Sequence, residues 1–156
     1  MTVLAYAAWA FAAGAMIPLM AILNAGLARA AGGIVQASVL LFAIGLLATL
    51  ALSSVVAARL PGFGTLSAIA PRQYAGGLIV AFYVLSITFL APRFGVGNAI
   101  LLAVTAQLVT AALIDHFALA GATLRPMTVV RAIGLAIVIL GVVISQVGDR
   151  ILTAFR

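Results

Sequence analysis

Five long stretches without any charged residue constrain most strongly what this chain can fold into. They are residues 1–28, 30–58, 73–92, 94–114 and 132–148. A helix needs roughly 20 apolar residues to cross the hydrocarbon core of a membrane, and most of these stretches reach that length. Membrane-spanning strands would alternate polar and apolar residues, which these stretches do not. The sequence therefore predicts an all-α membrane protein.

Turn-forming residues between the stretches predict the helix boundaries. We expect a single transmembrane domain over residues 1–156, a bundle of five membrane-spanning helices at about residues 3–27, 34–58, 73–91, 95–115 and 126–147. Pro126 fits the first position of the last helix, where its missing N–H costs nothing. The segment 60–72 is the longest connection, with room for one interfacial turn.

Composition and charge limit the classes of function. Only 6% of the residues are charged, against about a quarter in a soluble domain, and there is no cysteine. The net charge of +6 comes from arginines set singly at helix ends, which fits anchoring at phospholipid headgroups and not nucleic-acid binding. The single histidine, the lack of paired carboxylates and the lack of a phosphate-binding loop predict no enzyme, metal site or cofactor.

The arginines are balanced between the two sides of the membrane. With five spans, one side receives Arg59, Arg72, Arg125 and Arg131, and the other receives Arg29, Arg93, Arg150 and Arg156. An excess of lysine and arginine normally marks the cytoplasmic loops. A balance of four to four favours insertion in both orientations; a single orientation fixed by another signal stays open.

Polar residues inside the spans are the candidates for a substrate cavity. We name Asn24, Tyr83, Gln107 and Thr110. Gln107 lies near the middle of the fourth predicted helix, and Thr110 shares its face. Because an amide exposed to lipid is costly, Gln107 should face another helix or a wet cavity. Hydrogen bonding between helices and contact with a substrate both explain it.

Ionisable residues gather where the fourth helix ends. Asp115 and His116 close that helix, and Arg131 lies near the start of the fifth. A carboxylate at a helix C-terminus and a cation near an N-terminus each oppose the helix dipole, and a short hairpin would let them compensate each other. We predict an Asp115–Arg131 ion pair, which serves either as a staple or, with His116, as a proton site.

Glycines recur every seven residues in the last helix, at Gly134, Gly141 and Gly148. This spacing places them on one face, where another helix backbone can approach closely. A helix-packing seam is the main interpretation, and contact with a substrate is the alternative.

Several motifs resemble the YdcZ-type family of half-size members of the drug/metabolite transporter superfamily. They are the run Pro18–Leu27, the pair Gly76-Gly77, the run Leu90–Gly95, Gln107 with Leu113-Ile114-Asp115-His116-Phe117, and the stretch from Arg125-Pro126 to Arg131–Gly134. The motif of the fourth helix is the most specific. Where the family often has glycine, before the glutamine and after the phenylalanine, this chain has Ala106 and Ala118. Both are small, so the packing is preserved.

The resemblance implies one half of a ten-helix transporter fold with inverted repeats, whose substrate lies between the repeats near the midplane. It also implies a multi-pass protein of the bacterial inner membrane. Small multidrug-resistance exporters, to which the chain is more distantly similar, rely on a glutamate in their first helix. This chain has no acidic residue before Asp115.

We therefore expect a transporter or exporter of a small organic molecule that works as a homodimer, with antiparallel copies, by alternating access. Its partners would be a second copy, the lipid bilayer and the small-molecule substrate. One alternative is a non-transporting helical subunit that scaffolds another protein. Another is a dual-topology ion channel, which the lack of an acidic ring or a carbonyl-filter motif disfavours.

Overall fold

The structure, a computed structural model, describes residues 2–56 and 59–154. Within those ranges five helices are long and apolar enough to cross a membrane, and no residue forms a strand. They are α1 (Val3–Ala30), α2 (Ile34–Val55), α4 (Pro71–Phe94), α5 (Val96–Phe117) and α6 (Val129–Ala154). The prediction of an all-α membrane protein with five spanning helices is confirmed.

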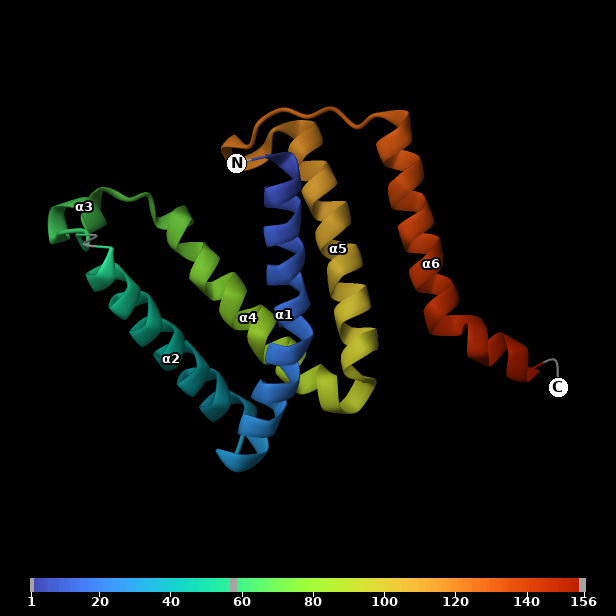
Figure 1. Cartoon of the computed structure of the whole chain (residues 1–156), viewed down its shortest axis with the longest axis horizontal. Coiled ribbons are helices and arrows are strands. Elements are labelled where there is room, and N and C mark those ends of the chain that lie inside the picture. Colours follow the sequence, from blue (N-terminus) through green and yellow to red (C-terminus); the bar gives the residue numbers. More distant parts are fainter. Residues whose placement is uncertain (1, 57–58, 155–156) are drawn as a thin grey trace. The chain divides into compact units, whose positions relative to one another are not determined.

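Contacts divide the chain into two compact units, Met1–Val96 and Gly97–Arg156. In the first unit α1 packs against both α2 and α4, which also pack against each other (Figure 1). The second unit consists of α5 and α6 with a largely extended connection between them. The single domain predicted over residues 1–156 stays a prediction.

Small residues make up most of the core of the first unit, to which α4 adds Val84 and Ile87. Ala21 and Ala25 on α1, Ala37 on α2 and Ala91 on α4 are all at most 8% exposed. Since alanine projects only a methyl group, helices that meet through alanines can approach each other closely. The three helices are therefore held together where their alanines lie.

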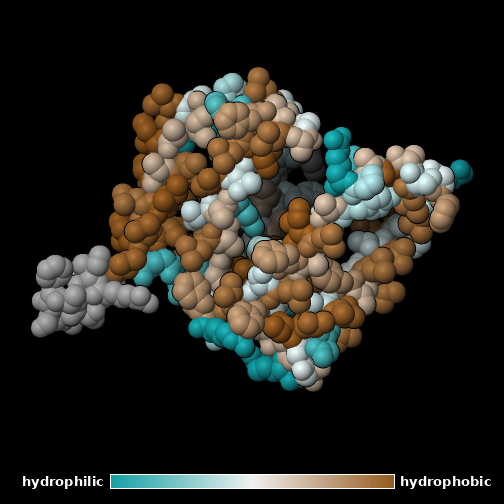
Figure 2. All heavy atoms as spheres, turned by 180° about the vertical axis from the view of Figure 1, so that it is seen from behind, coloured by the Kyte–Doolittle hydropathy of each residue, from teal (hydrophilic) through white to brown (hydrophobic). Residues whose placement is uncertain are grey.

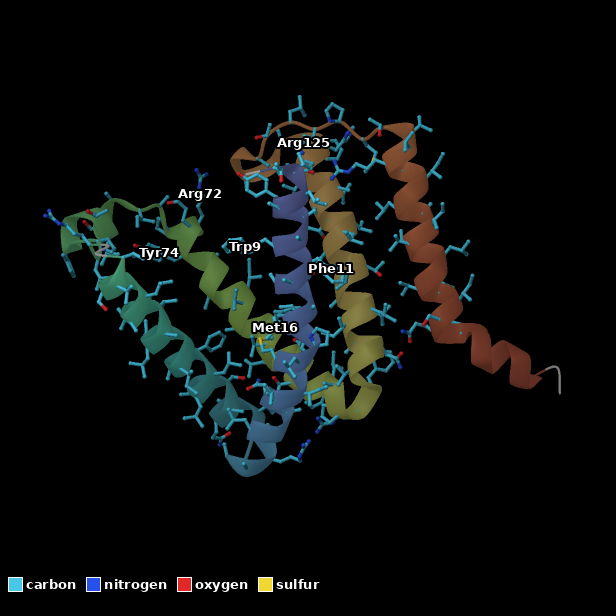
Figure 3. The ribbon with its side chains drawn as sticks, viewed as in Figure 1. Trp9, Phe11, Met16, Arg72, Tyr74 and Arg125 are labelled. Atoms are coloured by element: carbon cyan, nitrogen blue, oxygen red, sulfur yellow. The ribbon has the colours of Figure 1, made fainter. Side chains whose placement is uncertain are left out.

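The connection between α2 and α4 contains the predicted interfacial turn, a short helix α3 (Phe63–Ala68). The Tyr74 hydroxyl, on the first turns of α4, donates a hydrogen bond of 2.7 Å to the Leu66 carbonyl oxygen. Arg72 and Tyr74 are labelled at this end of α4 in Figure 3. The bond anchors α3 to the helix that follows it.

Helix α4 is longer at both ends than the predicted 73–91. Pro71 lies in its first turn, where proline is favoured. At the other end the helix continues two residues past Pro92, although the missing N–H of this proline removes one backbone hydrogen bond. It ends at Gly95, whose φ of 90° belongs to the left-handed region that glycine adopts freely.

Helix α6 begins at Val129, so the prediction that it starts at Pro126 is wrong. The Arg131 N–H donates 3.2 Å to Thr128 Oγ1, and the Ala132 N–H donates 2.9 Å to the Thr128 carbonyl oxygen. These bonds make Thr128 the cap, because its side chain satisfies an N–H that the first turn leaves free. At the end of α2, residues 57–58 of the predicted 34–58 lie outside the described part.

Little of each span is covered by the chain itself. Between 6% and 22% of the most apolar window of each spanning helix is buried. Hydrophobic residues predominate on the face seen in Figure 2, and hydrophilic residues form small separate patches. Such a surface needs an apolar surrounding, which a bilayer provides.

Candidate functional site

A polar pair lies in the core of the first unit, where α1 meets α4. Asn24 and Thr88 are each 3% exposed, and Asn24 Nδ2 donates a hydrogen bond to Thr88 Oγ1. The Thr88 hydroxyl donates 2.7 Å to the Val84 carbonyl oxygen one turn earlier. Asn24 was a predicted site residue. Its partner could not be predicted, because 64 residues separate the two and only the packing of α1 on α4 joins them.

Two buried oxygen atoms near these helix contacts have no hydrogen-bond partner among the described residues. They are Asn24 Oδ1 and, on α2, Ser38 Oγ. A buried acceptor that stays unpaired costs about 1–3 kcal/mol, so folding alone does not account for a buried asparagine here. This marks Asn24 as a candidate contact for a ligand. Ser38 was not recognised in the sequence, since a lone serine in a helix can bond to its own backbone.

Asn24 lines an apolar hollow of about 330 Å³ between α1 and α2, which we call the α1/α2 groove. Figure 3 shows Met16 on the same side of α1 as α2 and α4. The other lining side chains are all apolar. They are Met16, Leu19, Met20, Leu23, Leu27, Leu41 and Ile44.

Thr88 lines a second hollow, of about 400 Å³, with Arg29 and Arg93 on its walls. We call it the arginine recess. Arg93 Nη1 donates 2.8 Å to the Phe89 carbonyl oxygen, and its guanidinium lies 3.8 Å from the centre of the Phe89 ring. Because no acidic residue precedes Asp115, the recess is positively charged. The Asn24–Thr88 hydrogen bond thus joins a wall of the groove to a wall of the recess.

The predicted ion pair forms at one end of the second unit. Arg131 Nη2 lies 2.7 Å from Asp115 Oδ2, with side chains 40% and 30% exposed. The Arg125 N–H donates 2.8 Å to the Asp115 carbonyl oxygen, and the Met127 N–H donates 3.0 Å to His116 Nδ1. These hydrogen bonds hold the last part of the connection, just before α6, against the end of α5. A proton-site role for these residues stays a prediction.

A second polar contact joins α5 and α6 far from the ion pair. Gln146 Nε2 donates 3.1 Å to Asn98 Oδ1. Between the ion pair and this hydrogen bond lies a hollow of about 320 Å³. The Asn98–Gln146 contact could not be predicted from the sequence, because only the register of the hairpin brings these residues together. The hollow is lined by Leu108, Ala111, Ala112, Arg131, Gly134, Leu135 and Val138.

The remaining candidates have little contact with the chain that carries them. Gln107 and Thr110 are exposed on α5, and Gln107 makes no hydrogen bond within the described residues. Tyr83 is half-buried on a different face of α4 from Thr88. A Cβ added at Gly134 or Gly141 would meet nothing within 4 Å.

The predicted glycine seam therefore has no partner helix in the part of the chain that the structure describes. Gly148 lies outside the residues whose side chains are described. Whether the seam packs against another helix backbone stays a prediction.

Five apolar spanning helices define an integral membrane protein, and the comparison with known families gives its kind. The model of the family described as "Putative inner membrane exporter, YdcZ" matches residues 5–144, so the chain belongs to this family, as its motifs predict. The chain is a multi-pass protein of the inner membrane. The description of this family names an exporter and not an enzyme. Neither the comparison with curated proteins nor that with solved structures gave a match.

Proposed function

We propose that this protein exports a small organic molecule across the inner membrane, as an antiparallel homodimer that works by alternating access. The environment of Gln107 supports this proposal independently of the family match. It lies in the middle of a span, exposed and without a hydrogen bond in the described part of the chain. Transfer of an amide from water to hydrocarbon without a hydrogen-bond partner costs roughly several kcal/mol of free energy. A second copy, or the cargo between two copies, would satisfy it.

The exposed surface of helix α6 also supports assembly with a second copy. Only 6% of its apolar span is buried within the chain, and the positions of Gly134 and Gly141 open onto free space. Glycines on one face of a membrane helix favour close contact with another helix, because they let the two backbones approach. A second copy would give this face a partner.

The number of spans favours an antiparallel arrangement. Because five is odd, an inverted copy supplies the inverted half that a ten-helix transporter carries in one chain. The balance of four arginines against four lets one gene produce both orientations. A two-fold axis in the membrane plane would then place the midplane residues of both copies around one cavity.

Flux through reconstituted protein tests the export function. Proteoliposomes are screened against a panel of small organic molecules, and the protein with Gln107→Leu is compared with the protein with Thr105→Val. The Thr105 hydroxyl donates 2.8 Å to the Leu101 carbonyl oxygen of its own helix, so its removal leaves no partner unpaired. We expect Gln107→Leu to lower flux or dimer content at least tenfold and Thr105→Val to change neither.

Two outcomes count against the proposal. Unchanged flux and assembly in Gln107→Leu would show that the amide is idle. A panel without any substrate-dependent flux, together with a stoichiometric unlike partner in a native pull-down and no self-dimer, would favour a scaffold subunit instead.

Orientation is tested by biasing the arginines. Adding two or three arginines to one side should force a single orientation and abolish flux, and co-expression of two oppositely biased versions should restore it. If one biased version alone is fully active, or if labelling finds every terminus on the same side, the antiparallel dimer is wrong.

A further inference from the structure

The α1/α2 groove and the unpaired oxygen of Asn24 together point to a class of ligand. We propose that this groove binds neutral, lipophilic molecules that carry a hydrogen-bond donor, with the donor on Asn24 Oδ1 and the apolar body along the groove. The site lies within the first unit and needs no second copy. The inference rests on the proposed export function only in identifying the bound molecule as the cargo.

The groove supplies one polar atom that needs a partner. Among the described residues Asn24 is the only polar one that lines the groove, and its Oδ1 is buried with no hydrogen bond to any of them. A ligand donor would satisfy this oxygen, whereas an acceptor placed there would be repelled. The volume of about 330 Å³ lies at the lower end of the range of about 300–1,000 Å³ for small-molecule sites, so the ligand is small.

Charge in the first unit disfavours a cationic ligand. Residues 1–96 contain no acid and four arginines, Arg29, Arg59, Arg72 and Arg93. A cation in the groove would lose its hydration without gaining a counter-charge. An anion fares no better there, because Arg29 and Arg93 line the arginine recess and not the groove. A neutral ligand remains.

The groove is open along its side, and some of the side chains that line it move easily. Leu23 and Ile44 line it and are 65% and 63% exposed, so the groove is open along its side to a molecule dissolved in the bilayer. Asn24 Oδ1 itself is covered, so a donor reaches it only after neighbouring side chains move. Met16 and Met20 make such movement inexpensive, because methionine has three rotatable bonds and a polarisable sulfur.

Four probes built on one scaffold test the ligand class with the full-length protein in detergent. They are 4-butylphenol, its methyl ether, 4-butylbenzoate and (4-butylphenyl)trimethylammonium. Binding is measured by titration calorimetry. We expect the phenol to bind about tenfold more tightly than the ether, because the ether lacks the donor, and the two ions to bind more weakly than the ether. The probes partition into micelles equally with every variant. This partitioning therefore cancels when the ratio of phenol affinity to ether affinity, the phenol-to-ether ratio, is compared between variants.

Variants then assign the preference to Asn24. Asn24→Leu should reduce the phenol-to-ether ratio to about one while the ether still binds. Ser38→Ala is the matched control, because it removes the other unpaired buried oxygen without altering a groove residue, and it should keep the ratio. Ile44→Phe fills the groove from an exposed position and should weaken phenol and ether alike. This third variant reports on the groove even if Asn24→Leu does not fold.

Three results overturn the inference: equal binding of phenol and ether by the unaltered protein, a preference that survives Asn24→Leu, or binding of the benzoate more tightly than the phenol. The last would move the site to the arginine recess.

Flux of the same probes separates this inference from the proposed function. A phenol preference without phenol flux in proteoliposomes supports the binding site and contradicts export of that ligand class. Flux of other molecules, together with equal binding of phenol and ether, supports the export function and contradicts the proposed binding site.

Discussion

The helices within each of the two units are held together in different ways. In the first, α1, α2 and α4 pack through buried alanines such as Ala21 and Ala37, around one internal polar pair. In the second, α5 and α6 are joined by polar contacts near their ends, Asp115–Arg131 and Asn98–Gln146, with a hollow between. The first unit makes its own core, whereas the second leaves the middle of its helices for another surface to cover.

This difference separates two roles. Close packing fixes side chains in one geometry, which a binding residue such as Asn24 requires. Helices tied mainly at their ends keep a free face along the middle, where Gln107 and the two glycines lie. We infer that the first unit supplies the ligand site and that the second supplies the dimer interface. The predictions that follow test this division, from the largest expected effect to the smallest.

Enlarging a small residue should have opposite consequences in the two units. Ala37 is 0% exposed between packed helices, so Ala37→Leu should lower the free energy of unfolding by about 2–3 kcal/mol through overpacking. Gly141 lies inside α6 with free space around it, so Gly141→Leu should not lower that free energy, because leucine favours the helix more than glycine does, and it should weaken self-association. Unfolding in detergent titrations and crosslinking of the dimer measure the two effects. Equal destabilisation by both changes would remove the contrast between the units.

The ion pair of the second unit should contribute about 1 kcal/mol. Asp115→Asn and Arg131→Gln each remove the charge attraction between side chains that are 30% and 40% exposed, which limits the effect. The double variant should lose less stability than the sum of the two single changes, because the pair can be broken only once. Strict additivity in the same unfolding titrations would show that the two residues do not interact.

The smallest effect concerns the two alanines that stand where the family often has glycine. Ala118 follows α5 with a φ of 50°, a left-handed conformation that costs roughly 1 kcal/mol for any residue with a Cβ. Ala118→Gly should therefore stabilise the protein by about 0.5 kcal/mol after the larger entropy of the unfolded glycine is subtracted. Ala106→Gly, inside α5, should destabilise it by about 1 kcal/mol. Melting temperatures that shift in the same direction for both would contradict this account.

Ala118 also illustrates how far the sequence alone reaches. The resemblance to the family marked position 118 as unusual, but the reason is its left-handed backbone, which only the turn after α5 creates. Thr128 is a similar case. Its ability to cap a helix is visible in the sequence, yet Pro126 was the stronger local signal, and the structure places the start of α6 after Thr128.

The sequence by itself determined the number of spans, the membrane environment, the family and the Asp115–Arg131 pair. These depend on apolar length, on motifs and on a short hairpin, and all of them are local properties of the chain. Tertiary structure alone decided which uncharged polar side chains are paired between helices. Asn24 meets Thr88 across 64 residues, and Asn98 meets Gln146 across 48, because helix packing sets these distances. It also left Asn24 Oδ1 buried without a partner beside an apolar groove, since the residues that cover an atom come from several helices at once.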